Sequence, residues 1–286
     1  MKVHAIQTGT VAVKTRQREG VGTGKRRFIN MLLDRTWTEP LPIYAWAIEH
    51  DEGVIVVDTG ETARTSEPHY FPRWHPYFRS GLREWVQPEE EIRPQLERLG
   101  IEPSGVRIVV MTHLHTDHAG GLHHFPQSEV LVSGRELRDA QGFMGRARGY
   151  LNNRFPEWFS PRVVEFQPEP LGPFPTSLTL TKAGDVRLAP TPGHTPGQLS
   201  VVIDEGEGRR IFLAGDSSYT EELMLRGRLD GVAPDDHAAR LTLERIRRLC
   251  HDEAVVYLPS HDPGSARRLD ERRTANAIPD RATVVA

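Results

Sequence analysis

The chain alternates between short apolar runs and longer segments in which apolar and charged positions recur with a helical period. Runs rich in β-branched residues predict strands at residues 42–48, 54–58, 106–112, 130–132, 188–190, 199–203, 211–214 and 255–259. Helical patterns lie between them, one at 88–100, which opens with acidic residues and stops at Gly100, and one at 236–250. Strands that alternate with helices predict an α/β domain in which helices cover sheets.

Composition and charge place the chain among ordinary soluble globular proteins. Charged residues make up 26% and hydrophobic residues 37% of its 286 residues. No repeat or low-complexity linker divides it, so we expect one domain over residues 1–286. Lys and Arg number 36 against 39 Asp and Glu, a net charge of -3. This balance predicts no general attraction to nucleic acid or to an anionic membrane, and neither is an expected partner.

The chain shows no pattern for export or for a membrane span. Its first residues, MKVHAIQTGT, lack the apolar core of about 7–15 residues that a signal peptide needs. No apolar run reaches the roughly 18 residues of a transmembrane helix. The one cysteine, Cys250, excludes an internal disulfide and is expected in the core. We therefore expect a cytoplasmic protein.

Residues 112–121 read THLHTDHAGG, which places three histidines and a carboxylate directly after the strand-like run VRIVVM. A loop held by a rigid scaffold is where polar side chains converge without disrupting a core. Histidines two positions apart in an extended segment point to the same side. Imidazole and carboxylate groups suit Zn²⁺, Fe²⁺, Mn²⁺ or Co²⁺. Four hydrated polar residues on a loop are the alternative, but the spacing His-x-His-x-Asp-His favours a metal site.

Three further ligand-type residues follow strand-like runs later in the chain. His194 lies in PTPGHTPGQ after VRLAP, Asp216 follows the run IFLAG, and His261 follows VVYLPS. Glycine or proline stands close to each of them. Three such residues in order predict additional ligands for one metal site.

With these residues the chain resembles the metallo-β-lactamase superfamily, whose pattern is His-x-His-x-Asp-His, then His, a bridging Asp and a last His. The resemblance covers residues 53–261 and implies a four-layer αββα sandwich with the metals at one edge. It implies two divalent cations per chain, with zinc favoured and iron, cobalt or manganese as alternatives. The implied ligands are His113, His115 and His194 for the first cation, Asp117, His118 and His261 for the second, and Asp216 as the bridge.

Within this superfamily the chain resembles the N-acyl homoserine lactonases. In that family a tyrosine three residues past the bridging aspartate points at the substrate carbonyl, and Tyr219 of GDSSYT holds that position. The upstream segments NMLLDRTW and LPIYAWAIEHDEGVIVVDTG also look like the lactonase N-terminal region. The resemblance implies that a metal-bridging hydroxide attacks the lactone carbonyl, that Tyr219 donates a hydrogen bond to the developing charge, and that Asp117 delivers a proton.

Two aromatic-rich segments, 69–78 and 142–159, fall between the ligand-bearing strands and favour a pocket for an apolar tail. The predicted pocket contacts are Met31, Trp37, Tyr77, Phe78 and Tyr219. The alternative is that the aromatics pack a helix onto the domain or form a subunit interface, which would suit a homodimer. The predicted partner is a small lactone or ester with an apolar tail.

Polar residues outside the ligand pattern receive simpler interpretations. Asp58, in VVDTG, is expected to orient a ligand histidine. His123 and His124 are predicted on a helix behind the site, without a ligand role. Histidines without ligand spacing, such as His50 and His75, are predicted at the surface.

The pattern leaves other functions open. The nearest are a lactonase for another ring, an arylesterase or a phosphotriesterase, because dimetal chemistry suits all of them. A hydroxyacylglutathione hydrolase is less favoured, since only GSARRLDERR offers a basic cluster near the C-terminus. A non-catalytic sensor would tend to lose ligands. A mononuclear iron dioxygenase would leave unused the second site that Asp117 and His118 suggest.

Overall fold

The computed structural model of the chain describes residues 1–276, and its strands form two β-sheets. The first sheet has seven strands in the order β4-β1-β2-β3-β5-β6-β7. They are β1 (Lys2–Val13), β2 (Leu41–Glu49), β3 (Val54–Val57), β4 (Leu82–Trp85), β5 (Val106–Val110), β6 (Glu129–Ser133) and β7 (Arg162–Val164). The last ten residues of the predicted domain, 277–286, lie outside the described part of the chain.

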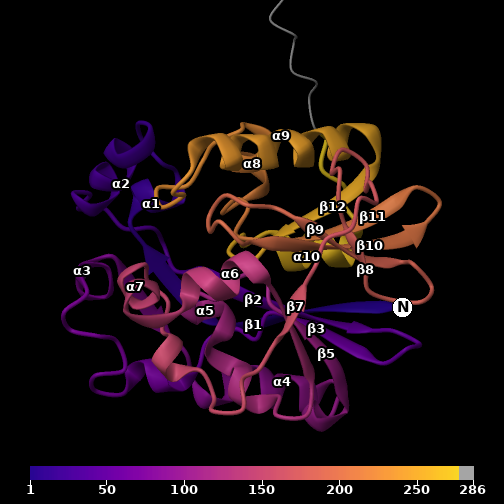
Figure 1. The fold of residues 1–286 in the computed structure, drawn as a ribbon, viewed down its shortest axis with the longest axis horizontal. Helices are drawn as coiled ribbons and strands as arrows, with labels where there is room; N and C mark the ends of the chain where they lie inside the picture. Colours follow the sequence, from indigo (N-terminus) through magenta and orange to yellow (C-terminus); the bar gives the residue numbers. More distant parts are fainter. Residues whose placement is uncertain (277–286) are drawn as a thin grey trace, which may run out of the picture.

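The second sheet has five strands in the order β12-β11-β10-β9-β8. They are β8 (Leu178–Thr179), β9 (Val186–Pro190), β10 (Leu199–Gly206), β11 (Arg209–Gly215) and β12 (Ala254–Pro259). Its strands β11 and β12 run parallel, whereas β8, β9 and β10 pair antiparallel. Figure 1 shows the two sheets one above the other, between α9 at the top and α4 at the bottom.

Helices cover the outer faces of both sheets and fill the edge where the loops converge (Figure 1). The helices are α1 (Thr15–Arg18), α2 (Gly24–Leu32), α3 (Pro76–Ser80), α4 (Ile92–Arg98), α5 (Thr116–Ala119), α6 (Gly134–Ala140), α7 (Gly142–Ala147), α8 (Glu221–Leu225), α9 (Asp236–Asp252) and α10 (Ser265–Glu271). Of these, α10 contacts β1 and β12 and packs Leu269 into the core between the two sheets. Short 3₁₀ helices are η1 (Ala63–Ser66), η2 (Pro88–Glu90), η3 (Pro103–Gly105), η4 (Gly120–His124) and η5 (Asn152–Arg154). Within residues 1–276, no helix has both the length and the apolar character to cross a membrane.

The central strands are buried on both faces, which explains their nearly unbroken apolar runs. In β12, Val256 and Leu258 join the core between the two sheets, whereas Val255 and Tyr257 join the core beneath α9. Side chains alternate with a period of two along a strand, so a run without polar positions buries both of its faces. The cores between the sheets and under each helical layer confirm the predicted four-layer αββα sandwich.

The sequence prediction located the central strands and missed the peripheral ones. All the predicted strands are present, with ends that differ by a few residues, but β1, β4, β7 and β8 were not predicted. The predicted helix at 88–100 is interrupted at Glu91, whose φ of -58° and ψ of 156° are extended, so η2 and α4 are separate. The second helix was correct, since α9 spans 236–252.

Candidate metal centre

Seven ligand-type side chains meet where strands of both sheets end. They are His113, His115, Asp117, His118, His194, Asp216 and His261, which are the seven predicted from the sequence. The seven-stranded sheet supplies four of them, from the segment that follows β5 and includes α5. The five-stranded sheet supplies the other three, directly after β9, β11 and β12. The fold thus brings together residues that lie up to about 150 positions apart.

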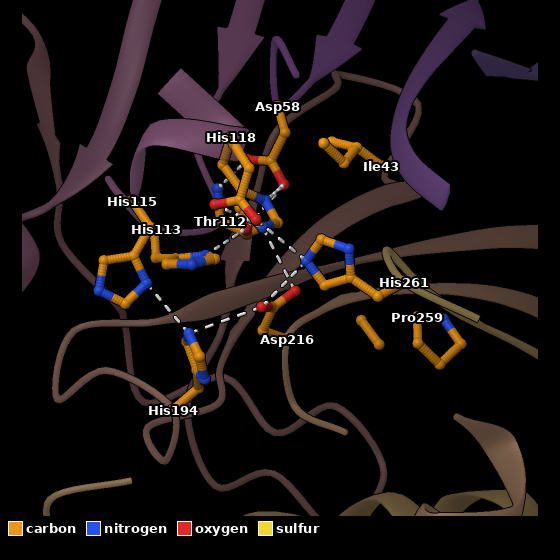
Figure 2. Close-up of polar contacts among 12 residues, drawn as sticks. Ile43, Asp58, Thr112, His113, His115, His118, His194, Asp216, Pro259 and His261 are labelled. Atoms are coloured by element: carbon orange, nitrogen blue, oxygen red, sulfur yellow. Dashed lines mark hydrogen bonds and ion pairs between the residues drawn. The ribbon is translucent and has the colours of Figure 1, made fainter. Parts of the chain in front are cut away.

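The carboxylate of Asp216 lies at the centre of the cluster (Figure 2). Its Oδ1 is 3.3 Å from Nε2 of His118, and its Oδ2 is 3.3 Å from Nε2 of His261 and 3.5 Å from Nε2 of His194. The preceding Gly215 has a φ of 55°, and a Cβ there would come within 2.8 Å of the Thr112 hydroxyl. Glycine therefore lets β11 approach the ligand loop closely, and the two carboxylate oxygens face different histidines.

Further contacts extend the cluster on both sides of this carboxylate. Oδ2 of Asp117 is 3.3 Å from Nε2 of His261, and Nδ1 of His115 is 3.0 Å from Nε2 of His194. The ligand atoms of three overlapping groups lie within 4.8 Å of one another: His113–His115–His194, His113–His118–Asp216 and Asp117–His118–His261. Donor atoms at such separations can share a metal ion.

Asp58 orients His118, as the sequence predicted. Its Oδ2 is 2.8 Å from Nδ1 of His118, and it also accepts hydrogen bonds of 2.7 Å from the backbone N–H and the hydroxyl of Thr112. The backbone of Asp58 has a φ of 57°, a left-handed conformation that aspartate adopts more readily than most residues. A carboxylate only accepts, so Nδ1 of His118 carries the hydrogen and Nε2 turns its lone pair toward the cluster.

Two other histidines are oriented in the same way. Nδ1 of His194 donates to Oδ2 of Asp230 at 2.7 Å, and Nδ1 of His261 donates to the carbonyl oxygen of Pro42 at 2.9 Å. In the neutral form of these rings, which a metal ligand requires, their Nε2 atoms are acceptors that face Asp216. A partner on the outer ring nitrogen that fixes the tautomer is the usual arrangement of metal-binding histidines. Neither Asp230 nor Pro42 was identified from the sequence, because nothing near them in the chain indicates the contact.

Three buried atoms of the cluster have no hydrogen-bond partner: Nε2 of His113, Nε2 of His118 and Oδ1 of Asp216. An unsatisfied buried polar group costs about 1–3 kcal/mol. Nε2 of the neutral His118 ring also faces the Asp216 oxygen across 3.3 Å, an arrangement that is favourable only with a cation or a proton between the two atoms. A cation would satisfy these atoms together, and the imidazole and carboxylate donors fit divalent ions of the zinc, iron, cobalt and manganese class.

The charges of the cluster show the same preference for a cation. Burial lowers the pKa of His261, but the carboxylates of Asp216 and Asp117 outweigh burial and raise this pKa to about 10. Burial raises the pKa of Asp216, but His261 and His118 outweigh it and hold this pKa well below its usual range. Burial and the neighbouring imidazoles lower the pKa of His115 to about 3, so that ring is neutral. The carboxylate-rich part of the cluster therefore stabilises positive charge.

The cluster forms one wall of a cavity of about 710 Å³. Five of its seven side chains line this cavity, namely His115, Asp117, His194, Asp216 and His261. The apolar part of the lining includes Val11, Val13, Phe28, Ile29, Phe78 and Leu82. A volume in the range of about 300–1,000 Å³, apolar walls and a few convergent polar groups are typical of small-molecule sites.

Tyr219 lines the cavity beside the cluster, and its ring stacks on that of His261 with a centroid distance of 5.5 Å. Its hydroxyl accepts a hydrogen bond of 3.0 Å from the side-chain amide of Gln17, which also donates to the Tyr77 hydroxyl at 2.8 Å. Both hydroxyl groups therefore act as acceptors toward Gln17, and the hydrogens of Tyr77 and Tyr219 remain free to be donated to other groups. Burial and the neighbouring Tyr77 raise the pKa of Tyr219 well above its usual value, so its hydroxyl stays protonated. The sequence analysis missed Gln17, because a glutamine in KTRQREG has no distinguishing pattern.

The predicted pocket contact at Met31 is wrong. Met31 is fully buried beneath α2 and does not line the cavity, whereas Phe28 and Ile29 of the same helix do. Helical spacing alone does not separate these positions, because residues three apart lie only about 60° apart around a helix. The sequence indicated the right segment but could not show which side chains of this nine-residue helix reach the cavity.

The predicted pocket contact at Trp37 is also wrong. The Trp37 ring lies between two cations, 3.9 Å from Nζ of Lys14 and 4.0 Å from Cζ of Arg83, and it does not line the cavity. Cations attracted to the faces of the ring account for its position. Trp37 therefore joins the N-terminal segment to β4.

The aromatic segments divide between the two interpretations that the sequence left open. Tyr77 and Phe78 line the cavity, as predicted. Phe155 and Phe159 instead pack against the core beneath the seven-stranded sheet. His75, predicted at the surface, is buried, and its Nε2 donates to the Ala147 carbonyl at 3.1 Å, which joins the two segments.

A buried carboxyl group ties the ligand loops together without touching the cluster. Glu136 of α6 accepts a hydrogen bond from the N–H of Leu114 at 3.0 Å and another from the hydroxyl of Thr195 at 2.7 Å. Leu114 lies between two ligand histidines, and Thr195 follows His194. This role was not predicted, because GRELRDA is an ordinary helical pattern.

The amino-acid sequence matches a known protein family and several known relatives. The family model of the metallo-beta-lactamase superfamily matches residues 38–261. A probable metallo-hydrolase of Mycobacterium bovis is 35% identical over 188 residues, which cover 64% of this chain and 57% of the length of that relative. An N-acyl homoserine lactonase of Bacillus sp is 26% identical over 242 residues, 84% of this chain and 86% of that protein.

Solved structures agree with the architecture. An N-acyl homoserine lactone hydrolase with the product N-hexanoyl-L-homoserine bound at its catalytic metal centre superposes with a TM-score of 0.72 and 21% identity. The match covers 93% of this chain and 95% of that one. At this identity the similarity establishes the fold, and the chemistry rests on the side chains described above.

Proposed function

The chain belongs to the metallo-beta-lactamase superfamily, and from this premise we propose that it is a metal-dependent hydrolase that opens the lactone ring of N-acyl homoserine lactones. The observation that carries the proposal is the convergence of seven ligand-type side chains on the wall of a cavity of about 710 Å³ with an apolar lining. The similarity to a Bacillus lactonase over 84% of this chain supports the same substrate class.

The cluster is proposed to hold two divalent cations, with zinc favoured. His113, His115 and His194 would hold one, Asp117, His118 and His261 the other, and Asp216 would contact both. When bound, two such cations lower the pKa of water toward about 7, which supplies a hydroxide nucleophile at neutral pH, and they polarise a carbonyl oxygen. Asp58, Asp230 and the Pro42 carbonyl keep the ligand rings in the required tautomer.

Tyr219 is proposed to donate a hydrogen bond to the oxygen on which negative charge develops. The Tyr219 hydroxyl oxygen accepts a hydrogen bond from Gln17, so the hydroxyl hydrogen is free to be donated to a ligand in the cavity. Its raised pKa keeps that hydrogen in place at neutral pH. A donor of this kind contributes most when the charge is transient and the site is shielded from water.

Asp117 is proposed to carry the proton that the reaction moves. It lines the cavity, and His118 and His261 outweigh its burial and lower its pKa to about 2, so it is a carboxylate at rest. A carboxylate can accept the proton of the attacking water and return it to the alkoxide that ring opening leaves. The ring C–O bond breaks, and the products are a carboxylate and a hydroxyl group.

The apolar lining is proposed to hold the acyl tail of the substrate. Val11, Val13 and Leu82 contribute one wall and Phe28 and Ile29 another. Burial of each methylene group is worth about 0.8 kcal/mol, so a longer tail should bind better until it fills the cavity. No nucleic acid is proposed as a partner.

A homodimer in the cytoplasm is proposed as the working form. Several large apolar side chains are exposed, with Leu33 70%, Phe143 62% and Met144 59% exposed. Exposed apolar surface of this kind is typical of contact sites. Light scattering on the purified protein tests this assembly, and a monomer mass at micromolar concentration would exclude it.

A substrate panel on protein with a measured metal content tests the proposed function. It should include acyl homoserine lactones of increasing chain length, an aryl ester, a phosphotriester and a glutathione thioester. We expect the highest kcat/KM for the lactones, with an increase along the acyl series. A higher value for the aryl ester or the phosphotriester would assign the site to those reactions instead, and a preference for the thioester would favour a glutathione hydrolase.

A further inference from the structure

A second cluster of ligand-type side chains lies outside the cavity. Glu91 stands directly before α4, and His123 and His124 are the last residues of η4. One ligand atom from each of the three lies within 4.8 Å of the others. None of them lines the cavity, so the cluster is separate from the proposed catalytic centre.

The carboxylate of Glu91 is held in place by one of its oxygens. Oε1 accepts hydrogen bonds from the hydroxyl of Thr62 at 3.0 Å and from the N–H of Ala63 at 2.8 Å. Oε2 is thereby directed at the histidines, 2.6 Å from Nε2 of His124 and 3.6 Å from Nε2 of His123. Carboxylates that ligate metals are typically held by hydrogen bonds of this kind, here on Oε1, while the other oxygen faces the imidazoles.

The tautomer of His123 leaves a lone pair in the cluster. Its Nδ1 is 3.1 Å from the carbonyl oxygen of Gly120, which only accepts, so Nδ1 carries the hydrogen of the neutral ring. The Nε2 lone pair then faces the Glu91 carboxylate, beyond hydrogen-bond distance, at 3.6 Å. The His123 and His124 rings lie with centroids 3.9 Å apart, so both rings present Nε2 to the same carboxylate oxygen.

We propose that Glu91, His123 and His124 form a further binding site for a divalent transition-metal ion such as zinc. Two imidazoles and a carboxylate suit zinc, cobalt, nickel and iron rather than magnesium or calcium. Metal–ligand bonds of about 2.0–2.1 Å place tetrahedral donors about 3.3 Å apart. The Glu91–His123 separation of 3.6 Å is close to this value, and the Glu91–His124 separation of 2.6 Å must widen.

Binding moves one proton and needs little other rearrangement. The hydrogen now shared between His124 and Glu91 passes to Nδ1 of His124 or to solvent as the metal takes its place. The His123 side chain is 43% exposed, whereas those of His124 and Glu91 are 13% and 12% exposed. One side of the site is thus open, and water can complete the coordination.

The position of the site indicates a structural effect rather than a role in chemistry. The chain from η4 leads back through α5 to His118, whose carbonyl oxygen accepts from the N–H of Thr59. An ion bound here would join η4 to the start of α4 and to the turn at Thr62. It would therefore brace the segment that carries two of the catalytic ligands, and this holds whatever substrate the enzyme takes.

Equilibrium dialysis against zinc, with metal counted per chain by mass spectrometry, tests the site on the intact, catalytically loaded protein. We expect the wild type to hold one zinc ion more than His123→Ala and Glu91→Gln. Each variant should bind this ion at least about 10-fold more weakly. Added zinc should raise the Tm of the wild type by several degrees and leave that of His123→Ala unchanged. Turnover of His123→Ala in the absence of added zinc should equal that of the wild type.

His251→Ala is the matched control, because it removes an exposed histidine that is paired with a neighbouring carboxylate, Asp252, elsewhere on the surface. It should retain the wild-type zinc count. Equal zinc counts in the wild type and His123→Ala would overturn the proposal, and so would an equal loss in His251→Ala. If Glu91→Gln misfolds because of its contacts with Thr62 and Ala63, His123→Ala decides alone, since its side chain makes one hydrogen bond.

Discussion

Two clusters of histidine and carboxylate side chains draw on the segment 113–124, one on residues 113–118 and the other on residues 123–124, and they differ in burial and in hydrogen bonding. In the cluster proposed to hold the catalytic metals, named the catalytic cluster, His113 and His118 are fully buried, and their Nε2 atoms have no hydrogen-bond partner. In the outer cluster, His123 is half exposed and His124 makes a short hydrogen bond with Glu91. The same residue types thus give one site whose buried polar atoms lack partners without a cation and another whose polar atoms are largely paired without one.

This difference predicts different affinities for metal. The unsatisfied buried atoms of the catalytic cluster carry a desolvation cost that metal binding relieves, and this relief makes the binding free energy more favourable. The outer cluster must first give up a hydrogen bond and remains partly hydrated. We therefore expect the catalytic cluster to bind zinc more tightly than the outer cluster.

The largest effect is expected from Asp216→Ala. Loss of the central carboxylate leaves His118, His194 and His261 without their shared partner. We expect both metal occupancy and turnover to fall by more than the roughly 10–100-fold that loss of an outer hydrogen-bond partner costs. Elemental analysis and lactone hydrolysis measure the two. In Glu91→Gln the catalytic metal should remain, and full metal retention in Asp216→Ala would show that this carboxylate is not a ligand.

The next largest effect is expected from Tyr219→Phe. Loss of one hydrogen-bond donor to a developing oxyanion should lower kcat by about 10²-fold with the metal content unchanged. Tyr77→Phe is the matched control, because its hydroxyl shares the same Gln17 amide but its ring does not stack on His261. Equal, small losses in both variants would show that the two hydroxyls only position Gln17.

A smaller effect on turnover is expected from Asp230→Asn. This change preserves the shape of the side chain but weakens the partner of His194 Nδ1. We expect zinc affinity at the catalytic cluster to fall by about 10–100-fold, with activity restored by excess zinc. Competition with a chelator measures the affinity. Unchanged affinity would mean that burial alone fixes the tautomer of His194.

The smallest effect is expected from a change in the apolar cavity beside the catalytic cluster. The outer cluster does not line this cavity. Phe28 lines that cavity and is 45% exposed. Phe28→Ser should therefore cost about 1 kcal/mol with a long-chain lactone, about a fivefold loss in kcat/KM, and almost nothing with a short-chain one. Phe143→Ser removes a comparable ring that is 62% exposed and does not line the cavity, and its chain-length profile should match the wild type.

The sequence by itself determined the layered fold and the identity of the inner ligands. Runs such as VVYLP and IFLAG are buried on both faces wherever they occur, because the period of a strand is local. The spacing His-x-His-x-Asp-His and the later His194, Asp216 and His261 are also local patterns, each anchored to the end of a strand. These features need no knowledge of what lies opposite.

Only the tertiary structure decided which atoms of those residues face one another. The hydrogen bond from His261 to Pro42 spans 219 positions, and that from His194 to Asp230 spans 36. The packing of α2 decided that Phe28 rather than Met31 meets the cavity, since Met31 is fully buried. The break at Glu91 brought this carboxylate to two histidines, and no pattern in the chain links them with it. A hydrogen bond between two residues far apart in the chain produces no periodic pattern in the sequence. Such contacts can therefore be identified only from the packed structure.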